Sequence, residues 1–223
     1  YWPIGPSDTR DYVKRKDLVA MTQLLQAKDR FNYTAGEIRV LDSDSWFQAP
    51  PDVYFAGELT VTAWVRLYSC NNFSRLLDFG NGVNSSDNVA LTLSNGVSCK
   101  PRFTVITNAT ESSLTAVTAL RLGVWEHVAV TLGNGNGNGT TQTLYLNGVI
   151  VGSAQLRQSG GPPRSVVRAN AYFGKSEWPS DAYANASFDE IRFYDRSLSY
   201  DELAGDMRTS SLAAFFTTTT TTT

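Results

Sequence analysis

Few residues of this chain have the types and spacing that enzymes use for nucleophilic, phosphate or zinc chemistry. The only histidine, His127, lies in a predicted strand without a motif serine nearby, so we interpret it as structural. The glycine-rich stretch 133–139 lacks the Lys-Ser/Thr pair and the following helix of a phosphate loop. Two cysteines and one histidine cannot complete a tetrahedral zinc site. Covalent modification and ligand binding therefore become the chemistry to consider.

Six Asn-x-Ser/Thr motifs without an intervening proline are candidate acceptors for N-linked glycans. Each lies in a predicted loop or at a strand end, where a bulky sugar can be accommodated. We therefore expect a secreted eukaryotic glycoprotein, although some motifs of this length arise by chance. The candidate acceptors are Asn32, Asn72, Asn84, Asn108, Asn138 and Asn185.

Cys70 and Cys99 are the only cysteines, and an even count beside glycosylation motifs predicts one disulfide. Closing a loop of about 30 residues would stabilise the fold by roughly 3–4 kcal/mol, mostly by restricting the unfolded chain. The alternative is a pair of buried free thiols.

A run of threonines closes the sequence and cannot pack into a core, because it offers hydroxyls but no apolar pattern. We interpret it as an O-glycosylated stalk, and the alternative is a bare β-prone strand that pairs with another chain. Since the chain begins at Tyr1 and ends inside this run, we expect a processed piece of a longer polypeptide. The predicted O-glycosylation sites are Thr217, Thr218, Thr219, Thr220, Thr221, Thr222 and Thr223.

Composition and charge narrow the class of protein. A hydrophobic content of 42% with 12% aromatic residues is enough for a sizeable core in one domain of 223 residues. The formal net charge of -2 provides no basic surface, so we expect no nucleic-acid binding. No apolar run reaches the about 18 residues that would predict a membrane span.

The hydrophobic period changes along the chain. Leu18, Met21, Leu24 and Leu25 recur at helical spacing, which predicts a short amphipathic helix over Lys16–Gln26. From about residue 36 onward the period becomes two, which predicts strands. The predicted strands are Glu37–Leu41, Leu59–Leu67, Arg75–Phe79, Asn88–Leu93, Arg102–Ile106, Leu114–Leu120, Trp125–Leu132, Thr143–Leu146, Val149–Ser153, Ala171–Gly174 and Ser187–Tyr194.

Turn and cap signals complete the predicted architecture. Asn147-Gly148 predicts a two-residue hairpin turn, because both central residues need positive φ. Ser199 and Glu202 have the spacing of a capping box and predict a closing helix. The fold class is therefore all-β, a two-sheet antiparallel jelly-roll sandwich with a short N-terminal and a short C-terminal helix. We expect an arm at 1–35, a jelly-roll domain at 36–208, and a Ser/Thr-rich linker with the poly-Thr tail at 209–223.

Three groups of stretches follow one another between about residues 36 and 207. They are Leu59–Arg66; Trp125–Val130 with Leu144–Gly148; and Phe173–Trp178 with Ser187–Tyr194 and Leu198–Leu203. In this order they resemble the laminin-G-like, concanavalin A-like jelly-roll family. The resemblance implies the fold but little about function, because this fold hosts lectins, adhesion modules, pentraxin-like proteins, hydrolases and passive spacers.

The resemblance also implies places for calcium and for sugars. Many relatives bind Ca²⁺ at one rim of the sandwich through Asp and carbonyl oxygens, and Asp181 occupies the corresponding loop. Trp178 and Tyr183 in this loop are aromatic candidates for stacking on a sugar. Two departures oppose a rim site: Ala186 stands where the family often has glycine, and a glycan on Asn185 would crowd the rim.

Large and charged residues within the strands have structural interpretations of their own. Trp64 and Trp125 are expected to fill the space between the sheets. Asp189 is expected to share a strand face with Ile191 and Phe193 and to need loop N–H groups or arginine side chains as partners. The alternative for Asp189 is a ligand-binding role.

Glycoside hydrolysis is the reaction that the resemblance suggests, and it needs two carboxylates about 5–10 Å apart. Jelly-roll glucanases carry Glu-x-Asp-x-x-Glu on one strand, whereas the acids of Phe188–Asp195 have a different spacing, so we predict no enzyme. The first hypothesis is a secreted structural glycoprotein on a Thr-rich stalk, assembling as a homo-oligomer or filament through Tyr1–Arg15 or the tail. The alternative is a carbohydrate-binding or adhesion module, lectin-like, with or without calcium.

Overall fold

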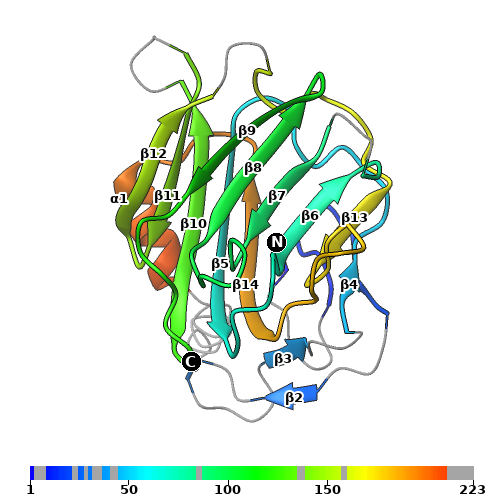
Figure 1. Cartoon of the computed structure of the whole chain (residues 1–223), viewed down its shortest axis with the longest axis vertical. Coiled ribbons are helices and arrows are strands. Elements are labelled where there is room, and N and C mark those ends of the chain that lie inside the picture. The colour runs from blue at the N-terminus through cyan, green and yellow to red at the C-terminus, as the bar shows by residue number, and fades with distance from the viewer. Residues whose placement is uncertain are drawn as a thin grey trace, which may run out of the picture.

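The computed structural model describes residues 1–2, 9–21, 25–27, 30–31, 37–40, 45–83, 87–134, 139–156 and 160–209. Within these residues the chain forms two seven-stranded antiparallel sheets that lie face to face, with one helix at the C-terminal side (Figure 1). This arrangement confirms the predicted all-β sandwich with a C-terminal helix. The described helix is not long and apolar enough to cross a membrane.

The chain crosses several times between the two sheets. In spatial order, the first sheet contains β1 (Val19–Ala20), β4 (Phe47–Gln48), β13 (Asn170–Phe173), β6 (Arg75–Gly80), β7 (Val89–Thr92), β8 (Arg102–Thr107) and β9 (Thr110–Thr115). The second sheet contains β12 (Val149–Gln155), β11 (Thr141–Leu146), β10 (Trp125–Gly133), β5 (Leu59–Leu67), β14 (Ala186–Tyr194), β3 (Glu37–Val40) and β2 (Leu25–Ala27). Strands β6 to β9 are consecutive in the first sheet, and β10 to β12 are consecutive in the second.

The core follows from the period of two in these strands. In β5, Val61, Ala63 and Val65 alternate toward the space between the sheets and are at most 1% exposed. In β7 and β8, Leu91 and Phe103 are paired across the sheet and fully buried, while their polar neighbours face outward. This alternation leaves one polar outer face on the first sheet.

The first residues of the chain belong to this core. Trp2 is 2% exposed, and its backbone exchanges two 2.9 Å hydrogen bonds with Ile191 of β14. Its indole meets Phe173 and Phe193 edge-on, with ring centroids 5.5 and 5.0 Å apart, and its Nε1 donates to the carbonyl of Lys16 at 2.8 Å. The N-terminal residues therefore close one part of the sandwich.

The helix predicted over Lys16–Gln26 is wrong for the described residues, which form β1 and β2 instead. Among Lys16–Met21, whose burial the structure describes, only Leu18 is buried, whereas Val19 and Met21 are 59% and 43% exposed. The N–H of Met21 donates to the carbonyl of Trp46 at 3.0 Å. The open edge of the first sheet supplies backbone partners to this segment, so sheet pairing prevails over the helical spacing of its apolar residues.

The predicted hairpin turn and capping box are confirmed. Asn147 and Gly148 have φ of 51° and 77°, as their two-residue turn requires. Helix α1 (Tyr200–Arg208) begins after Ser199, whose side chain accepts from the N–H of Glu202 while the Glu202 carboxylate accepts from the N–H of Ser199. Leu203 of α1 packs with Ala129 of β10 in a small cluster. Figure 1 shows α1 beside the strands of the second sheet.

One strand lies earlier than predicted. The strand expected at Leu114–Leu120 is β9, which begins at Thr110 and pairs with β8. Asn108 and Ala109 join the two strands with φ of 51° and 56°, a two-residue turn that the sequence pattern did not reveal because Ala109 is an unusual residue at positive φ.

Two predictions of side-chain orientation are wrong. Trp64 lies on the outer face of the second sheet, where its ring is 5.4 Å from that of His127, and Trp125 lies on the same face beneath Arg66. Asp189 pairs with Trp64 on this face and does not share the inward face of Ile191. The cause is a bulge in β14, where Glu190 has φ of 54° and the register shifts.

Candidate functional site

A hollow of about 200 Å³ opens on the outer face of the first sheet. Its floor consists of outward side chains from β7 and β8, namely Ala90, Thr92, Thr104 and Ile106. These positions alternate with the core residues of the same strands, so the pattern that builds the core also forms the floor. Arg75, Asn88, Arg102, Glu111, Trp178 and Asp181 also line the hollow.

Arg75 connects the sheet to the loop that follows β13. Its Nη2 donates to Asp181 Oδ2 at 2.8 Å, and its Nε donates to Asp78 Oδ2 at 3.2 Å. Ser176 Oγ donates to the same oxygen of Asp181 at 2.8 Å. The guanidinium lies 5.7 Å from the centre of the partly exposed Trp178 ring. One ion-pair network thus places this indole against the hollow.

These contacts bear on the predicted calcium role of Asp181. Its side chain is 10% exposed, and Oδ2 already accepts from Arg75 and Ser176. Across the described residues, no group of three or more His, Cys, Asp or Glu side chains could surround a metal ion. The calcium site stays a prediction without further side-chain ligands in the part of the chain that the structure describes.

The opposite wall of the hollow contains a second ion pair. Arg102 of β8 donates through Nη2 to Glu111 and, at 2.9 Å, to Ser113 Oγ, both on β9. Its Nε is buried and has no hydrogen-bond partner within the described residues. Asn88 Oδ1, also buried, is likewise unpaired there. Both atoms are enclosed by the protein, so a ligand in the hollow could contact them only after a side chain moves.

Burial shifts the ionisation of two carboxylates behind the loop, Glu177 and Asp78. Glu177 is held by Asn88 Nδ2 at 2.6 Å and by the N–H of Gly82 at 3.0 Å, and its own N–H donates to Asp78 Oδ2 at 3.2 Å. Burial and the neighbouring Asp78 raise the pKa of Glu177 to about 6. Burial also raises the pKa of Asp78, against the attraction of Arg75.

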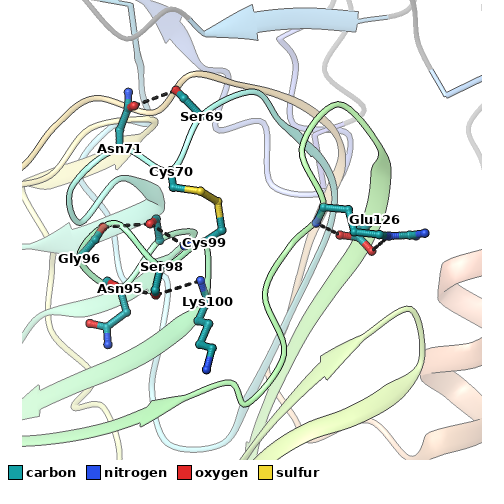
Figure 2. Close-up of a disulfide and its surroundings, with 11 residues drawn as sticks. Ser69, Cys70, Asn71, Asn95, Gly96, Ser98, Cys99, Lys100 and Glu126 are labelled. Atoms are coloured by element: carbon teal, nitrogen blue, oxygen red, sulfur yellow. Dashed lines mark hydrogen bonds and ion pairs between the residues drawn. A yellow bond between two sulfur atoms is a disulfide. The ribbon is translucent and has the colours of Figure 1, made fainter.

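The predicted disulfide is present and joins two loops (Figure 2). Cys70 follows β5 and Cys99 precedes β8, with their Cα atoms 4.9 Å apart. Asn71 donates to the carbonyl of Tyr183 at 3.0 Å, so the same region also contacts the loop that carries Trp178. The disulfide therefore supports one side of the hollow, and it is typical of extracellular proteins.

Three of the predicted glycan acceptors lie in the described part of the chain. Asn72 and Asn108 are exposed, and Asn185 is half-buried at the start of β14. Asn72 borders the hollow, because Phe73 lines it and the carbonyl of Asn72 accepts from the N–H of Ala182 at 2.8 Å. The remaining predicted sites lie outside the described residues: Asn32, Asn84, Asn138, Thr217, Thr218, Thr219, Thr220, Thr221, Thr222 and Thr223.

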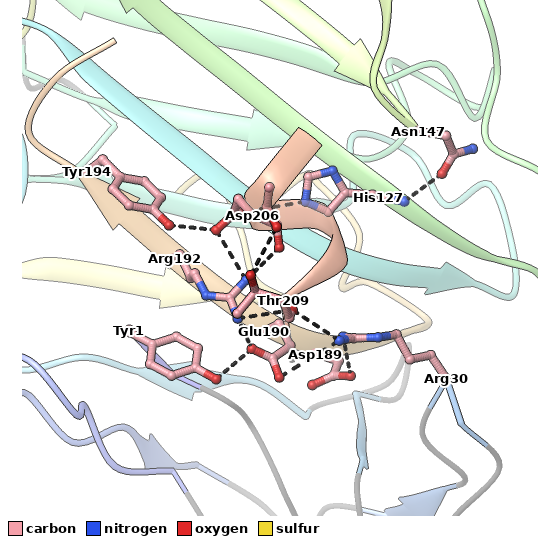
Figure 3. Close-up of polar contacts among 11 residues, drawn as sticks. Tyr1, Arg30, His127, Asn147, Asp189, Glu190, Arg192, Tyr194, Asp206 and Thr209 are labelled. Carbon is pink, nitrogen blue, oxygen red and sulfur yellow. Dashed lines mark hydrogen bonds and ion pairs between the residues drawn. The ribbon is translucent and has the colours of Figure 1, made fainter. Parts of the chain in front are cut away.

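The remaining polar candidates gather on the second sheet, away from the hollow (Figure 3). Asp189 Oδ2 accepts from Arg30 at 2.9 Å, which confirms the predicted arginine partner. His127 is 2% exposed and its Nε2 lies 3.6 Å from Asp206 Oδ2. Desolvation would raise the pKa of Asp206, yet hydrogen bonds from His127 and Tyr194 and the charge of Arg192 lower it to about 2.

The structure thus brings together Trp178 and Asp181 but leaves Tyr183 outside the hollow's lining. Sequence reasoning missed Arg75, Arg102 and Glu111. The signal for Arg102 was present in the alternation of β8, where it stands outward beside Phe103. No local pattern could show that Arg75 meets Asp181, since 106 residues separate them.

The family comparison agrees with this geometry. The family described as the concanavalin A-like lectin/glucanases superfamily matches residues 41–204. The chain belongs to this superfamily. The match confirms the resemblance seen in the sequence and covers most of the chain, whereas no curated protein sequence matches it.

Solved structures of this superfamily's fold include carbohydrate-related modules. Domain 4 of AbnA, a GH43 extracellular arabinanase from Geobacillus stearothermophilus, in complex with arabinotriose, is 14% identical, with a TM-score of 0.68, over 89% of this chain and 92% of that domain. The binding domain of botulinum neurotoxin serotype C1 is 12% identical, with a TM-score of 0.59. The match covers 84% of this chain and 45% of that one.

A third structure, the binding domain of botulinum neurotoxin DC in complex with SialylT, is 11% identical, with a TM-score of 0.58. The match covers 84% of this chain and 44% of that one. At such identities the likeness shows the fold alone. The chain therefore has the sandwich fold of this superfamily, and the choice of a ligand depends on its own residues.

Proposed function

We propose that this domain is a secreted carbohydrate-binding module that holds a sugar in the hollow on the first sheet. The observation that carries the proposal is the partly exposed indole of Trp178 at a hollow that is also lined by polar and charged side chains, among them Asn88 and Arg102. A sugar ring has an apolar C–H face that packs on an indole, and its hydroxyls both donate and accept.

The similar structures support this class of ligand. The arabinanase domain was solved with arabinotriose, and the arrangement of two sheets is shared along 89% of this chain. We propose binding without turnover, because both carboxylates that line the hollow are in ion pairs, Asp181 with Arg75 and Glu111 with Arg102. Neither is then free to act as the acid or nucleophile that glycoside hydrolysis needs.

A glycan array followed by calorimetry tests the proposal. Trp178→Ala should weaken binding of the best glycan at least tenfold, which corresponds to about 1.4 kcal/mol. Tyr200→Ala is the matched control, because Tyr200 is 63% exposed on α1, away from the hollow, and should leave affinity unchanged. Equal affinity in the two variants would show that the sugar binds at another site. Each titration is run with calcium and with EDTA, which tests the calcium role predicted for Asp181.

The exposure of Asn72 and Asn108 favours a second candidate function, a structural glycoprotein. In this proposal N-glycans cover the domain, and the threonine run is an O-glycosylated stalk through which copies assemble. Site-resolved glycan mass spectrometry and native mass measurement test it. Unmodified threonines, together with a monomer at every concentration, would overturn it.

A further inference from the structure

Two guanidinium groups line the hollow, and their hydrogen bonds within the protein decide how much positive charge a ligand can contact. Arg75 engages four of its five N–H groups inside the protein. They donate to Asp78, to Asp181, to the carbonyl of Phe73 at 2.9 Å and to Thr92 Oγ1 at 2.7 Å. Its side chain is only 9% exposed. No two-pronged fork is left to receive a carboxylate from a ligand.

Most N–H groups of Arg102 also donate to partners within the protein. Its Nη2 donates to Glu111 and Ser113, and its Nη1 donates to Asn95 Oδ1 at 3.3 Å. Its Nε is unpaired but enclosed by the protein, so Arg102 presents no free fork to a ligand. Each guanidinium that lines the hollow thus already faces a carboxylate that also lines it.

The groups that remain for a ligand are mostly acceptors. Asn88 Oδ1 is unpaired but enclosed by the protein, and its Nδ2 donates to Glu177. Glu111 is 47% exposed and presents negative charge to the hollow, with Asp181 on the opposite wall. A hydroxyl can donate to these oxygens, but a carboxylate or sulfate has only acceptors to offer.

We infer that the hollow selects neutral sugars and rejects acidic ones, with Glu111 as the residue that sets this specificity. The inference rests on the proposed sugar-binding function of the same hollow. A uronic acid, sialic acid or sulfated sugar would place its anion beside Glu111 or Asp181 without a free guanidinium to offset the repulsion. Like charges brought together in a binding site suppress the wrong ligand strongly.

The probes are neutral oligosaccharides and the same oligosaccharides oxidised at C6 to uronic acids, titrated into the intact protein. The pairs differ only in a CH₂OH group replaced by a carboxylate. We expect the neutral member of a binding pair to bind at least about tenfold more tightly, and we expect added salt to narrow the difference.

The variant Glu111→Gln tests whether Glu111 causes the difference in affinity between neutral and acidic sugars. It should raise the affinity for the acidic members severalfold relative to the affinity for their neutral partners. Asp201→Asn is the matched carboxylate-to-amide control, because Asp201 is exposed on α1 and should change neither. Since Glu111 is half-exposed, the variant should keep the wild-type fold, which circular dichroism checks.

The outcomes separate this inference from the proposed function. Acidic members that bind as tightly as their neutral partners, or more tightly, would overturn the inference and leave sugar binding intact. An unchanged difference in Glu111→Gln would overturn the role of Glu111. Failure of every neutral and acidic glycan to bind would overturn both proposals together.

Discussion

Replacing Trp2 by alanine should strongly destabilise the domain, although Trp2 is the second residue of the chain. Its indole is 2% exposed and packs against Phe173 and Phe193. Truncating a buried tryptophan to alanine costs about 3–5 kcal/mol, and loss of the hydrogen bond to the Lys16 carbonyl adds about 1 kcal/mol. For a chain of this size we expect the melting temperature to fall by about 10–20 °C.

Urea unfolding followed by far-ultraviolet circular dichroism measures this loss directly. Trp2→Phe should cost only about 1–2 kcal/mol, since the ring contacts remain and the hydrogen bond disappears. Trp178→Ala should change the free energy of unfolding by less than about 1 kcal/mol while weakening the proposed sugar binding at least tenfold. The two tryptophans should therefore show opposite effects in the stability and binding assays.

One result would refute the reasoning. If Trp2→Ala unfolds within about 1 kcal/mol of the wild type with the same dependence on urea, the N-terminal residues do not complete the core. If Trp2→Ala is as destabilising as expected, a chain that starts at residue 36 should be markedly less stable, because it lacks both Trp2 and Leu18.

Three further outcomes follow from the site. Glu177 has its pKa raised to about 6 in the folded state, so stability should increase by about 1 kcal/mol as pH falls from 7 to 4.5, and Glu177→Gln should flatten this part of the pH profile of melting temperature. Removing the disulfide in a Cys70→Ser, Cys99→Ser double variant should cost about 3–4 kcal/mol in chemical unfolding, since it closes a loop of 29 residues. If Asn72 carries a glycan at the rim of the hollow, Asn72→Gln and Ser74→Ala should each prevent its attachment, which mass spectrometry would detect. Both variants should then raise the sugar affinity equally. Unequal effects on affinity would contradict steric hindrance by the glycan.

The sequence allowed the sandwich to be predicted because the period of two is strong in long strands such as β5 and β10. It could not decide which face of a strand points inward where both faces carry apolar residues, as Trp64 beside Val65 shows. The bulge at Glu190 depends on pairing with β5, so the orientation of Asp189 was predicted wrongly. Such errors arise where tertiary pairing shifts a local register.

The candidate site was predictable only in part for a related reason. Trp178 and Asp181 were identified because they share one loop whose place the resemblance suggested. Arg75 and Arg102 come from different strands, and their meeting with that loop depends on the order of strands in the first sheet. Sequence spacing contains no information about such contacts between distant segments.

The polar network on the second sheet has a consequence for how this domain would be displayed. Tyr1 donates to Glu190, which pairs with Arg192, and Arg192 also reaches Asp206 and the carbonyl of Thr209 (Figure 3). The first residue and the end of the described chain are thus anchored on the same side, opposite the hollow. A support that contacted the domain at Thr209 would meet it on the side of the second sheet and leave the hollow uncovered.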